Sequence, residues 1–290
     1  LAVLLVMNRC FGYQKILNHW WVSVVIAGIS MLLPLAGSTF IVFFVGLMHL
    51  MTLSTDAAVI ALVLLAISYA VSAYFRSDNM MVIPACRYLN IPFVVPMEAG
   101  LMRSIHELPT IICGSVLSYY LKTVVENASS FLDPNTDLSA AELLQGQILN
   151  NSMFYIYLVA MTAMFLVVYT VRTKGIEHAW LVGVLSGVVV EFVLMLAGIL
   201  FTGEKENIPL LVIGNVVTLI VGLGMVFFAR GFDYTRTEHV QFEDDEYYYY
   251  VTAVPKMHIP EQEKEIKRIT SETLPLPVDD LEETEETQDN

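Results

Sequence analysis

The 290-residue chain is too apolar for an ordinary soluble domain, because 56% of its residues are hydrophobic, 15% are charged and its mean hydropathy is +0.62. The formal net charge of −14 belongs to the C-terminal end: residues 1–232 hold 10 Lys/Arg and 12 Asp/Glu, and residues 233–290 hold 5 and 17. This acidic end excludes nucleic acid and anionic lipid as partners bound by charge attraction, whereas basic protein surfaces stay compatible with it.

The chain carries no motif for a cofactor or a metal. Its three cysteines, Cys10, Cys86 and Cys113, form no CxxC pair and are expected to be small core hydrophobes. Walker A, GxGxxG and GxSxG patterns are absent. We therefore expect no nucleotide cofactor and no metal. The chain starts on the apolar run Leu1–Met7, which we interpret as the end of a truncated transmembrane helix or signal-like segment.

Residues Trp20–Leu53 form an uncharged stretch of 34 residues, which is too long for one ordinary spanning helix. Pro34 and Gly37 interrupt it. Two interpretations stay open: one long kinked helix with interfacial ends, or two short membrane segments that meet at Leu33–Ser38.

The next stretch alternates between a clear span and a polar interval. Ala57–Phe75 predicts a 19-residue spanning helix with Asp56 as its cap. The interval Arg76–Arg103 contains three prolines, and its apolar pieces, such as Ile91–Val95, are too short to cross. These pieces predict a re-entrant or interfacial segment. Leu108–Val125 predicts the next helix.

The polar connection Glu126–Asn151 begins the second half of the membrane domain. Its Ser139–Glu142 segment matches a capping box and predicts a surface helix of about ten residues. Three further spans follow, over Met153–Val171, Ala179–Phe201 and Ile208–Ala229. The fold class predicted is an all-α polytopic membrane protein with about six to eight transmembrane helices in a domain over residues 1–231.

Basic residues in the short connections predict an orientation. Arg76–Arg103 contains three Lys/Arg, and Thr170–His178 and Ala229–Arg236 contain two each. The alternate connections contain none, or only Lys205 between two acids. The positive-inside rule therefore predicts an integral protein of the cell membrane with a cytoplasmic C-terminus.

The C-terminal end divides into two parts. Residues 232–260 form a membrane-proximal Tyr-rich segment in which His239–Phe242 and Tyr247–Val254 predict a short β-hairpin. Residues 261–290 are acidic and predict a largely disordered tail. An exposed strand can add to the sheet of a partner. The candidate docking residues are Phe242, Tyr247, Tyr248, Tyr249 and Tyr250.

Glu191 is the most conspicuous residue of the sequence, because it lies near the middle of the apolar helix Ala179–Phe201. It shares one helical stripe with Gly183, Gly187 and Gly198, and small residues on a stripe allow close approach of another helix. A charge at this depth costs roughly 2.5–3.5 kcal/mol, so we expect protonation or a partner, for which Asn215 is the candidate. The alternatives are a proton- or cation-linked carboxylate and a protonated residue that only holds helices together.

A second group of polar residues, Glu98, Arg103, His106 and Glu107, lies within ten positions at the predicted cytoplasmic entrance of a helix. His106 and Glu107 could act as an acid/base pair. The second histidine of an HExxH motif is absent, however, and charges that neutralise one another at a helix start are the alternative.

Three functions are compatible with these observations. The first is a transport component, a permease or accessory subunit, with Glu191 and Asn215 near the path. The second is a membrane anchor or scaffold that recruits a cytoplasmic protein through the Tyr-rich tail. The third, which the sequence favours least, is an intramembrane enzyme that uses His106 and Glu107. The expected partners are the lipid bilayer, a cytoplasmic protein and other helices of an oligomer or complex.

Overall fold

The computed structural model describes residues 1–132, 139–174, 178–203, 208–231, 238–243 and 248–253. The chain divides into two compact units, Leu1–Gly231 and Phe232–Asn290. Within the described residues of the first unit, six helices are long and apolar enough to cross a membrane: α3 (Leu35–Leu53), α4 (Thr55–Phe75), α7 (Leu108–Glu126), α10 (Ser152–Thr173), α11 (Ala179–Thr202) and α12 (Ile208–Gly231). This confirms the prediction of a helical multi-pass membrane protein.

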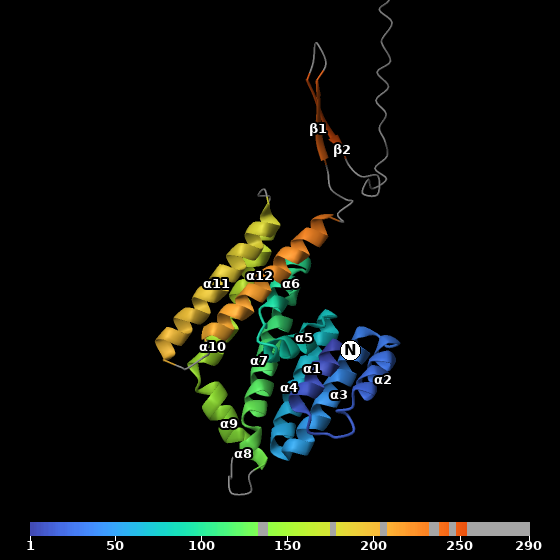
Figure 1. Cartoon of the computed structure of the whole chain (residues 1–290), viewed down its shortest axis with the longest axis vertical. Coiled ribbons are helices and arrows are strands. Elements are labelled where there is room, and N and C mark those ends of the chain that lie inside the picture. The colour runs from blue at the N-terminus through green and yellow to red at the C-terminus, as the bar shows by residue number, and fades with distance from the viewer. Residues whose placement is uncertain (133–138, 175–177, 204–207, 232–237, 244–247, 254–290) are drawn as a thin grey trace, which may run out of the picture. The chain divides into compact units, whose positions relative to one another are not determined.

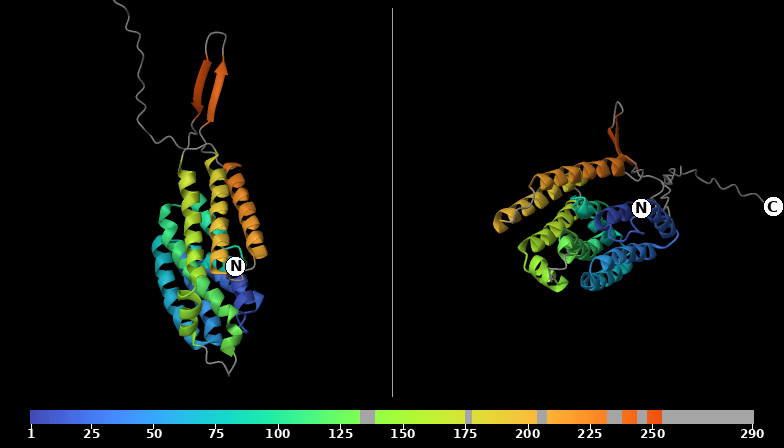
Figure 2. Two further views of the ribbon diagram at one scale, coloured as in Figure 1. Left: turned by 90° about the vertical axis from the view of Figure 1, so that its left-hand side faces the viewer. Right: turned by 60° about the horizontal axis from the view of Figure 1, so that its bottom comes forward.

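Shorter helices complete the first unit. They are α1 (Ala2–Phe11), α2 (Trp20–Met31), α5 (Asn79–Tyr88), α6 (Val94–Met102), η1 (Ile105–Glu107), α8 (Ala128–Leu132), α9 (Ala140–Leu143) and η2 (Leu144–Leu149). Figures 1 and 2 show α10, α11 and α12 side by side on one flank and α1–α4 on the other, with α5–α7 between them. The two halves therefore meet along α5, α6 and α7.

The bundle has two ends, the Arg103 end and the Glu126 end, and a hydrogen bond between distant segments lies at each. At the Arg103 end, Arg172 at the end of α10 donates to the carbonyl oxygen of Arg103, which follows α6, at 3.0 Å. At the Glu126 end, Asn127 after α7 donates to Gln147 in η2 at 2.8 Å. Both contacts join segments far apart in sequence, so they fix the relative positions of α6, α7 and α10.

The long uncharged stretch is divided at Leu32–Pro34 into α2 and α3. Proline lacks an N–H and cannot continue α2, but it precedes the first residue of α3 without loss. Ser38 Oγ donates to the carbonyl oxygen of Ser30 at 2.8 Å across this break. The structure thus has two helices here, of which only α3 is long enough to span.

Helix starts follow the polar residues of the sequence, with one correction. The predicted cap of α4, Asp56, lies in the first turn, and Ser54 caps the helix instead by accepting from the Ala57 N–H at 3.4 Å. A short hydroxyl side chain in extended backbone suits this position. The capping box of Ser139 and Glu142 is confirmed: it opens α9, which continues into η2.

Helices α5 and α6 form a helical hairpin, named the α5–α6 hairpin and covering residues Asn79–Met102. Ten residues of helix span about 15 Å, half of a ~30 Å hydrocarbon core. Asp78 before α5 and Arg103 after α6 form an ion pair at 2.7 Å. The start of α5 and the end of α6 therefore both lie at the Arg103 end. The chain turns back at Leu89–Phe93, where Asn90 has a φ of 61°. The structure has a helical hairpin here, and its re-entrant placement in the membrane stays a prediction.

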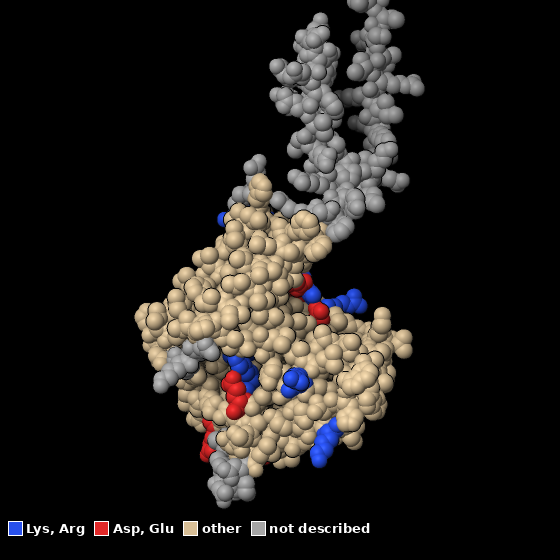
Figure 3. Space-filling model, viewed as in Figure 1, with Lys and Arg blue, Asp and Glu red and all other residues tan. Residues whose placement is uncertain are grey.

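The outer surface of the first unit is apolar. Large hydrophobic side chains are exposed on every spanning helix, with Phe201 at 90% and Phe227 at 73% exposure; on α7 the exposed one is Ile112. Figure 3 shows a face that is tan almost throughout, with few charged atoms. Lipid is the environment in which such a surface is stable.

The second unit contains two described strands, β1 (Glu238–Glu243) and β2 (Tyr248–Ala253). They pair antiparallel, with Glu238 opposite Ala253 and Glu243 opposite Tyr248. The disordered tail predicted over residues 261–290 lies outside the described residues.

Candidate functional site

A polar cavity of about 320 Å³ lies at the tip of the α5–α6 hairpin and is named the Arg87 cavity. Its polar lining comes from four helices and the hairpin turn: Arg87, Asn90, Lys122, Glu126, Tyr157 and Asn215. Figure 3 shows blue and red atoms gathered in a hollow of the otherwise tan face. Since lipid cannot hydrogen-bond such groups, a polar cavity at this place is a candidate binding site.

Glu191 is fully buried beside this cavity, at 0% exposure. Its glycine stripe packs against α10: a Cβ at Gly187 would lie 2.5 Å from Val168, and one at Gly198 would lie 2.6 Å from Ile156. The predicted close approach of a second helix is therefore present. The packing of this glycine stripe against α10 directs the carboxyl group of Glu191 into the bundle and away from lipid.

Asn215 connects Glu191 to the Arg87 cavity. Its Nδ2 donates to Glu191 Oε1 at 3.4 Å and to the carbonyl oxygen of Leu211 at 3.1 Å. Asn215 is only 7% exposed and lines the cavity, whereas Glu191 lies behind it and does not. Glu191 Oε2 and Asn215 Oδ1 are buried with no hydrogen-bond partner among the described residues. The pair thus has two unpartnered oxygen atoms next to a cavity.

Arg87 faces the cavity from the end of α5. Its guanidinium carbon lies 3.9 Å from the ring centre of Tyr157 and 4.5 Å from that of Tyr119. Two aromatic faces at these distances stabilise a cation through their quadrupoles. Arg87 is one of the three basic residues of the interval Arg76–Arg103 and was not predicted to be a site residue. The aromatic contacts that place Arg87 come from other helices, so the segment around it carries no local signal for them.

The turn of the hairpin packs tightly against α12. A Cβ at Gly214 would lie 2.5 Å from the carbonyl oxygen of Asn90, and one at Gly222 would lie 2.5 Å from Sδ of Met97. Only glycine permits this approach without displacement of backbone or side chain. The cavity is therefore bounded by a close contact between α12 and the hairpin.

The second predicted group is assembled around Arg103. Arg103 lies 3.4 Å from Glu98 and 3.9 Å from Glu107, and Asp78, which the sequence analysis did not include, lies at 2.7 Å. These four residues are named the Arg103 cluster. Burial raises the pKa of Glu98 above its ordinary value, and Arg103 opposes that shift. Neighbouring carboxylates raise the pKa of Arg103, against the effect of burial.

His106 does not share the chemistry of this cluster. Its side chain is exposed. Glu107 Oε2 instead accepts from Asn79 at 3.1 Å and from Thr110 at 3.0 Å, and these bonds hold the starts of α5 and α7 together. The arrangement fits charges that neutralise one another at a helix start, and it gives no support to an acid/base pair.

Another buried polar cluster joins α1, α2 and α3. Asn8 donates to Ser23 at 2.7 Å, and its Oδ1 lies 3.0 Å from His49 Nε2. Each of these side chains has a partner, so the cluster satisfies itself and stabilises packing. It contrasts with the unpaired oxygens of Glu191 and Asn215.

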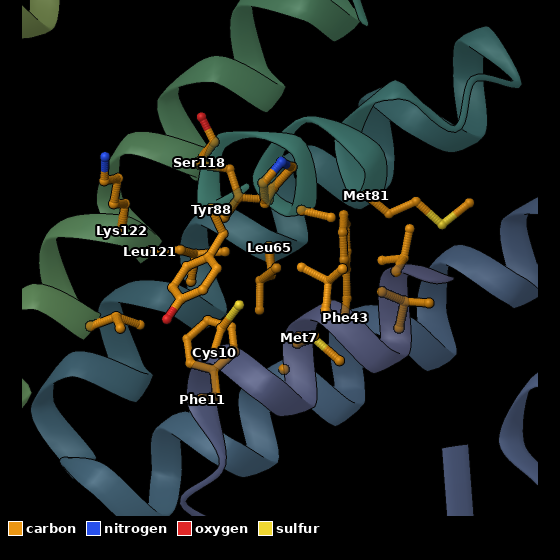
Figure 4. A pocket seen from close by; sticks show the side chains of 18 of the residues that line it. Met7, Cys10, Phe11, Phe43, Leu65, Met81, Tyr88, Ser118, Leu121 and Lys122 are labelled. Atoms are coloured by element: carbon orange, nitrogen blue, oxygen red, sulfur yellow. The ribbon is translucent and has the colours of Figure 1, made fainter. Parts of the chain in front are cut away.

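An apolar pocket of about 60 Å³ lies between α1, α3, α4, α5 and α7. Figure 4 shows Cys10, Phe11, Tyr88 and Leu121 around it, with Ser118 and Lys122 on α7. Burial raises the pKa of Cys10 to about 12. The pocket offers little beyond hydrophobic contact.

The docking residues proposed for the Tyr-rich segment lie in the second unit. Phe242 is in β1, Tyr248, Tyr249 and Tyr250 are in β2, and Tyr247 is outside the described residues. The register places Phe242 opposite Tyr249. A docking role for these residues stays a prediction.

Neither a metal site nor a relative identifies the protein. Where residues are described, no group of three His, Cys, Asp or Glu is arranged to hold a metal ion. Comparison with protein-family models, curated proteins and solved structures finds no match to this chain. The observations that bear on function are the class of protein, a multi-pass helical membrane protein, and the Arg87 cavity.

Proposed function

We propose that the first unit, Leu1–Gly231, is a membrane transport component, a permease or its accessory subunit. The observation that carries the proposal is a polar cavity of about 320 Å³ next to a buried carboxylate. Transport requires polar groups from separate helices to converge where lipid would otherwise exclude them. Asn215 from α12, Tyr157 from α10, Lys122 from α7 and Arg87 from α5 do so.

The α5–α6 hairpin supplies the polar backbone that such a site needs. Non-helical backbone is tolerated at membrane depth only where protein covers it or where it lines an aqueous cavity. Asn90 and Pro92 in the turn line the Arg87 cavity. Two short helices that meet inside the bilayer are a recurrent way of forming a solute site in transporters.

Glu191 is proposed as the proton-linked group. Its only described hydrogen bond comes from the neutral amide of Asn215, at 3.4 Å, and none of the described ion pairs includes it. A buried carboxylate with no cationic partner favours its neutral form. Proton loss would add a negative charge behind Asn215, next to the bound solute. Proton and solute binding are coupled through this residue.

The test compares Glu191→Gln and Glu191→Leu with wild type in proteoliposomes that contain a pH-sensitive dye. Proton movement is followed while gradients of small inorganic and organic ions are imposed. The amide keeps the volume and the contact with Asn215 but cannot titrate, so Glu191→Gln should fold normally and lose at least about 90% of the ion-driven proton movement. Glu191→Leu should also lose it.

Asp56→Asn is the matched control, because Asp56 is an exposed acid outside the cavity. It should retain the wild-type flux. Full proton movement in both Glu191 variants would remove the proposed role of this carboxylate. An unchanged flux in Glu191→Gln but not in Glu191→Leu would assign Glu191 to helix packing.

A second candidate function is a membrane anchor or scaffold. The observation that favours it is the two-stranded sheet of β1 and β2, in which each strand has only one described neighbour. An unpaired strand edge can accept a strand from a partner. The two functions differ in the part of the chain required: residues 1–231 for transport and residues 232–260 for capture of a cytoplasmic protein.

A further inference from the structure

The guanidinium of Arg87 has aromatic neighbours, and it forms no ion pair with any described residue. Among the ion pairs of the described residues, none includes Arg87, and its buried Nε has no hydrogen-bond partner. The rings of Tyr119 and Tyr157 hold the guanidinium in place without neutralising it. Arginine stays charged even when buried. Its environment is therefore incomplete without an anion.

The charges that line the cavity agree with this interpretation. Its lining contains two basic residues, Arg87 and Lys122, and one acidic residue, Glu126. Lys122 and Glu126 form a pair at 3.7 Å, one helical turn apart on α7. One positive charge is left over, and it belongs to Arg87. A monovalent anion would balance it.

The size and geometry of the site narrow the class of anion. At roughly 30 Å³ for each water, a cavity of about 320 Å³ holds on the order of ten waters, enough for a small organic molecule and too little to enclose a whole lipid. A guanidinium presents parallel N–H donors that match the two oxygens of a carboxylate. Asn90 and Asn215 supply further amide groups from the turn and from α12.

We propose that the Arg87 cavity binds a small carboxylate, with Arg87 as the residue that recognises it. This inference rests on the proposed transport function and names its substrate class. It also gives the coupling a sign. With Glu191 neutral, the site carries one net positive charge and accepts the carboxylate; with Glu191 ionised, that charge is cancelled and the carboxylate is released. Proton and carboxylate therefore move in the same direction.

The test measures binding, not transport, in the detergent-solubilised full chain. Thermal unfolding is followed with increasing benzoate, lactate, phosphate or chloride. A ligand that binds the folded chain raises Tm by mass action. We expect benzoate or lactate, each a monovalent carboxylate, to raise Tm with saturation, and phosphate and chloride to act only at much higher concentration. Arg87→Gln should weaken carboxylate binding roughly tenfold or more, because a charged hydrogen bond is lost.

Two further variants complete this test. Arg76→Gln removes an exposed arginine that does not line the cavity and should bind carboxylate as wild type does. Arg87→Lys keeps the charge and loses the fork, so its affinity should lie between wild type and Arg87→Gln. If Arg87→Gln does not fold, the carboxylate affinity of Arg87→Lys tests the role of Arg87. Equal carboxylate affinity in wild type and both Arg87 variants would overturn the inference.

The outcomes separate this inference from the proposed transport function. Saturable binding of phosphate or chloride in place of carboxylate would overturn the substrate class. A wild-type chain that binds none of the four probes would overturn the inference as a whole, while Glu191-dependent proton movement with cations would leave the transport function standing. Absence of ion-driven proton movement in the wild-type chain, together with intact carboxylate binding, would contradict the transport function alone.

Discussion

Arg103 contacts three carboxylates from three different segments. Asp78 precedes α5, Glu98 lies in α6 and Glu107 ends η1, at 2.7, 3.4 and 3.9 Å respectively. The Arg103 side chain is 28% exposed, so each pair contributes at most about 1 kcal/mol, but a network that shares one cation is more rigid than separate pairs. At the scale of the residue, this cluster joins the two arms of the α5–α6 hairpin.

Glu98 gives the cluster a pH dependence. Burial raises its pKa above the ordinary value of 4.5, although Arg103 lowers it in part. The folded chain then holds this proton more tightly than the unfolded chain does, so the free energy of unfolding falls as pH rises from about 4.5 through the folded pKa. Glu98→Gln should reduce that slope in thermal unfolding between pH 4.5 and 7. Asp56→Asn should retain it, and an unchanged slope in Glu98→Gln would show that other groups cause the dependence.

The sequence could identify Glu191 and could not identify Arg87, for a physical reason. A carboxylate within 24 residues of apolar helix is conspicuous because its neighbours along the chain are apolar. Arg87 lies in a segment with a polar and Pro-containing composition, which is also typical of a loop. Its role depends on Tyr119 and Tyr157, which come from other helices. Contacts between distant segments leave no local pattern.

At the scale of the element, the α5–α6 hairpin is the feature that creates the site. Short apolar pieces and prolines predicted a re-entrant or interfacial segment, but its boundaries and its depth depend on contacts with α7 and α12. Pro84 lies inside α5, where it has no N–H to donate to the carbonyl oxygen of Met80, one turn earlier. Asn90 adopts a left-handed conformation at the turn, which suits asparagine better than most residues.

The contact between Gly214 and the hairpin turn predicts a matched pair of variants on α12. A methyl group at Gly214 would lie 2.5 Å from the backbone oxygen of Asn90, whereas one at Gly224 would have nothing within 4 Å. Gly214→Ala should therefore lower the free energy of unfolding by about 1–3 kcal/mol through overpacking. Gly224→Ala should leave it unchanged or raise it by up to about 1 kcal/mol.

Differential scanning fluorimetry of both variants in one detergent gives the comparison. Gly214→Ala should have a lower Tm than Gly224→Ala. Gly214→Ala should also bind carboxylate less tightly than wild type, because the added methyl group displaces Asn90, which lines the cavity. Equal Tm values for the two variants would show that the hairpin turn and α12 are not in contact.

At the scale of the whole molecule, composition and the period of apolar residues were enough to predict the spanning helices. The ends of α7, α10, α11 and α12 lie within about three residues of the predicted bounds, because lipid demands long apolar helices. The arrangement of those helices was not predictable, since one apolar face can pack against many others. Arg87 lines the cavity at the tip of the hairpin and not the Arg103 end of the bundle. The connection Arg76–Arg103 therefore contributes two basic residues, not three, to the predicted orientation.

The central structural claim is that the α5–α6 hairpin enters and leaves the membrane on one side. Single cysteines at Arg76, Ser104, Thr173 and Asn150, all exposed, can be probed with an impermeant thiol reagent on intact and on permeabilised cells, with the parent chain as control. With the proposed cytoplasmic C-terminus, Asn150→Cys should react in intact cells, and the other three should react only after permeabilisation. Reaction of Arg76→Cys and Ser104→Cys from opposite sides would contradict the re-entrant hairpin and with it the cavity at its tip.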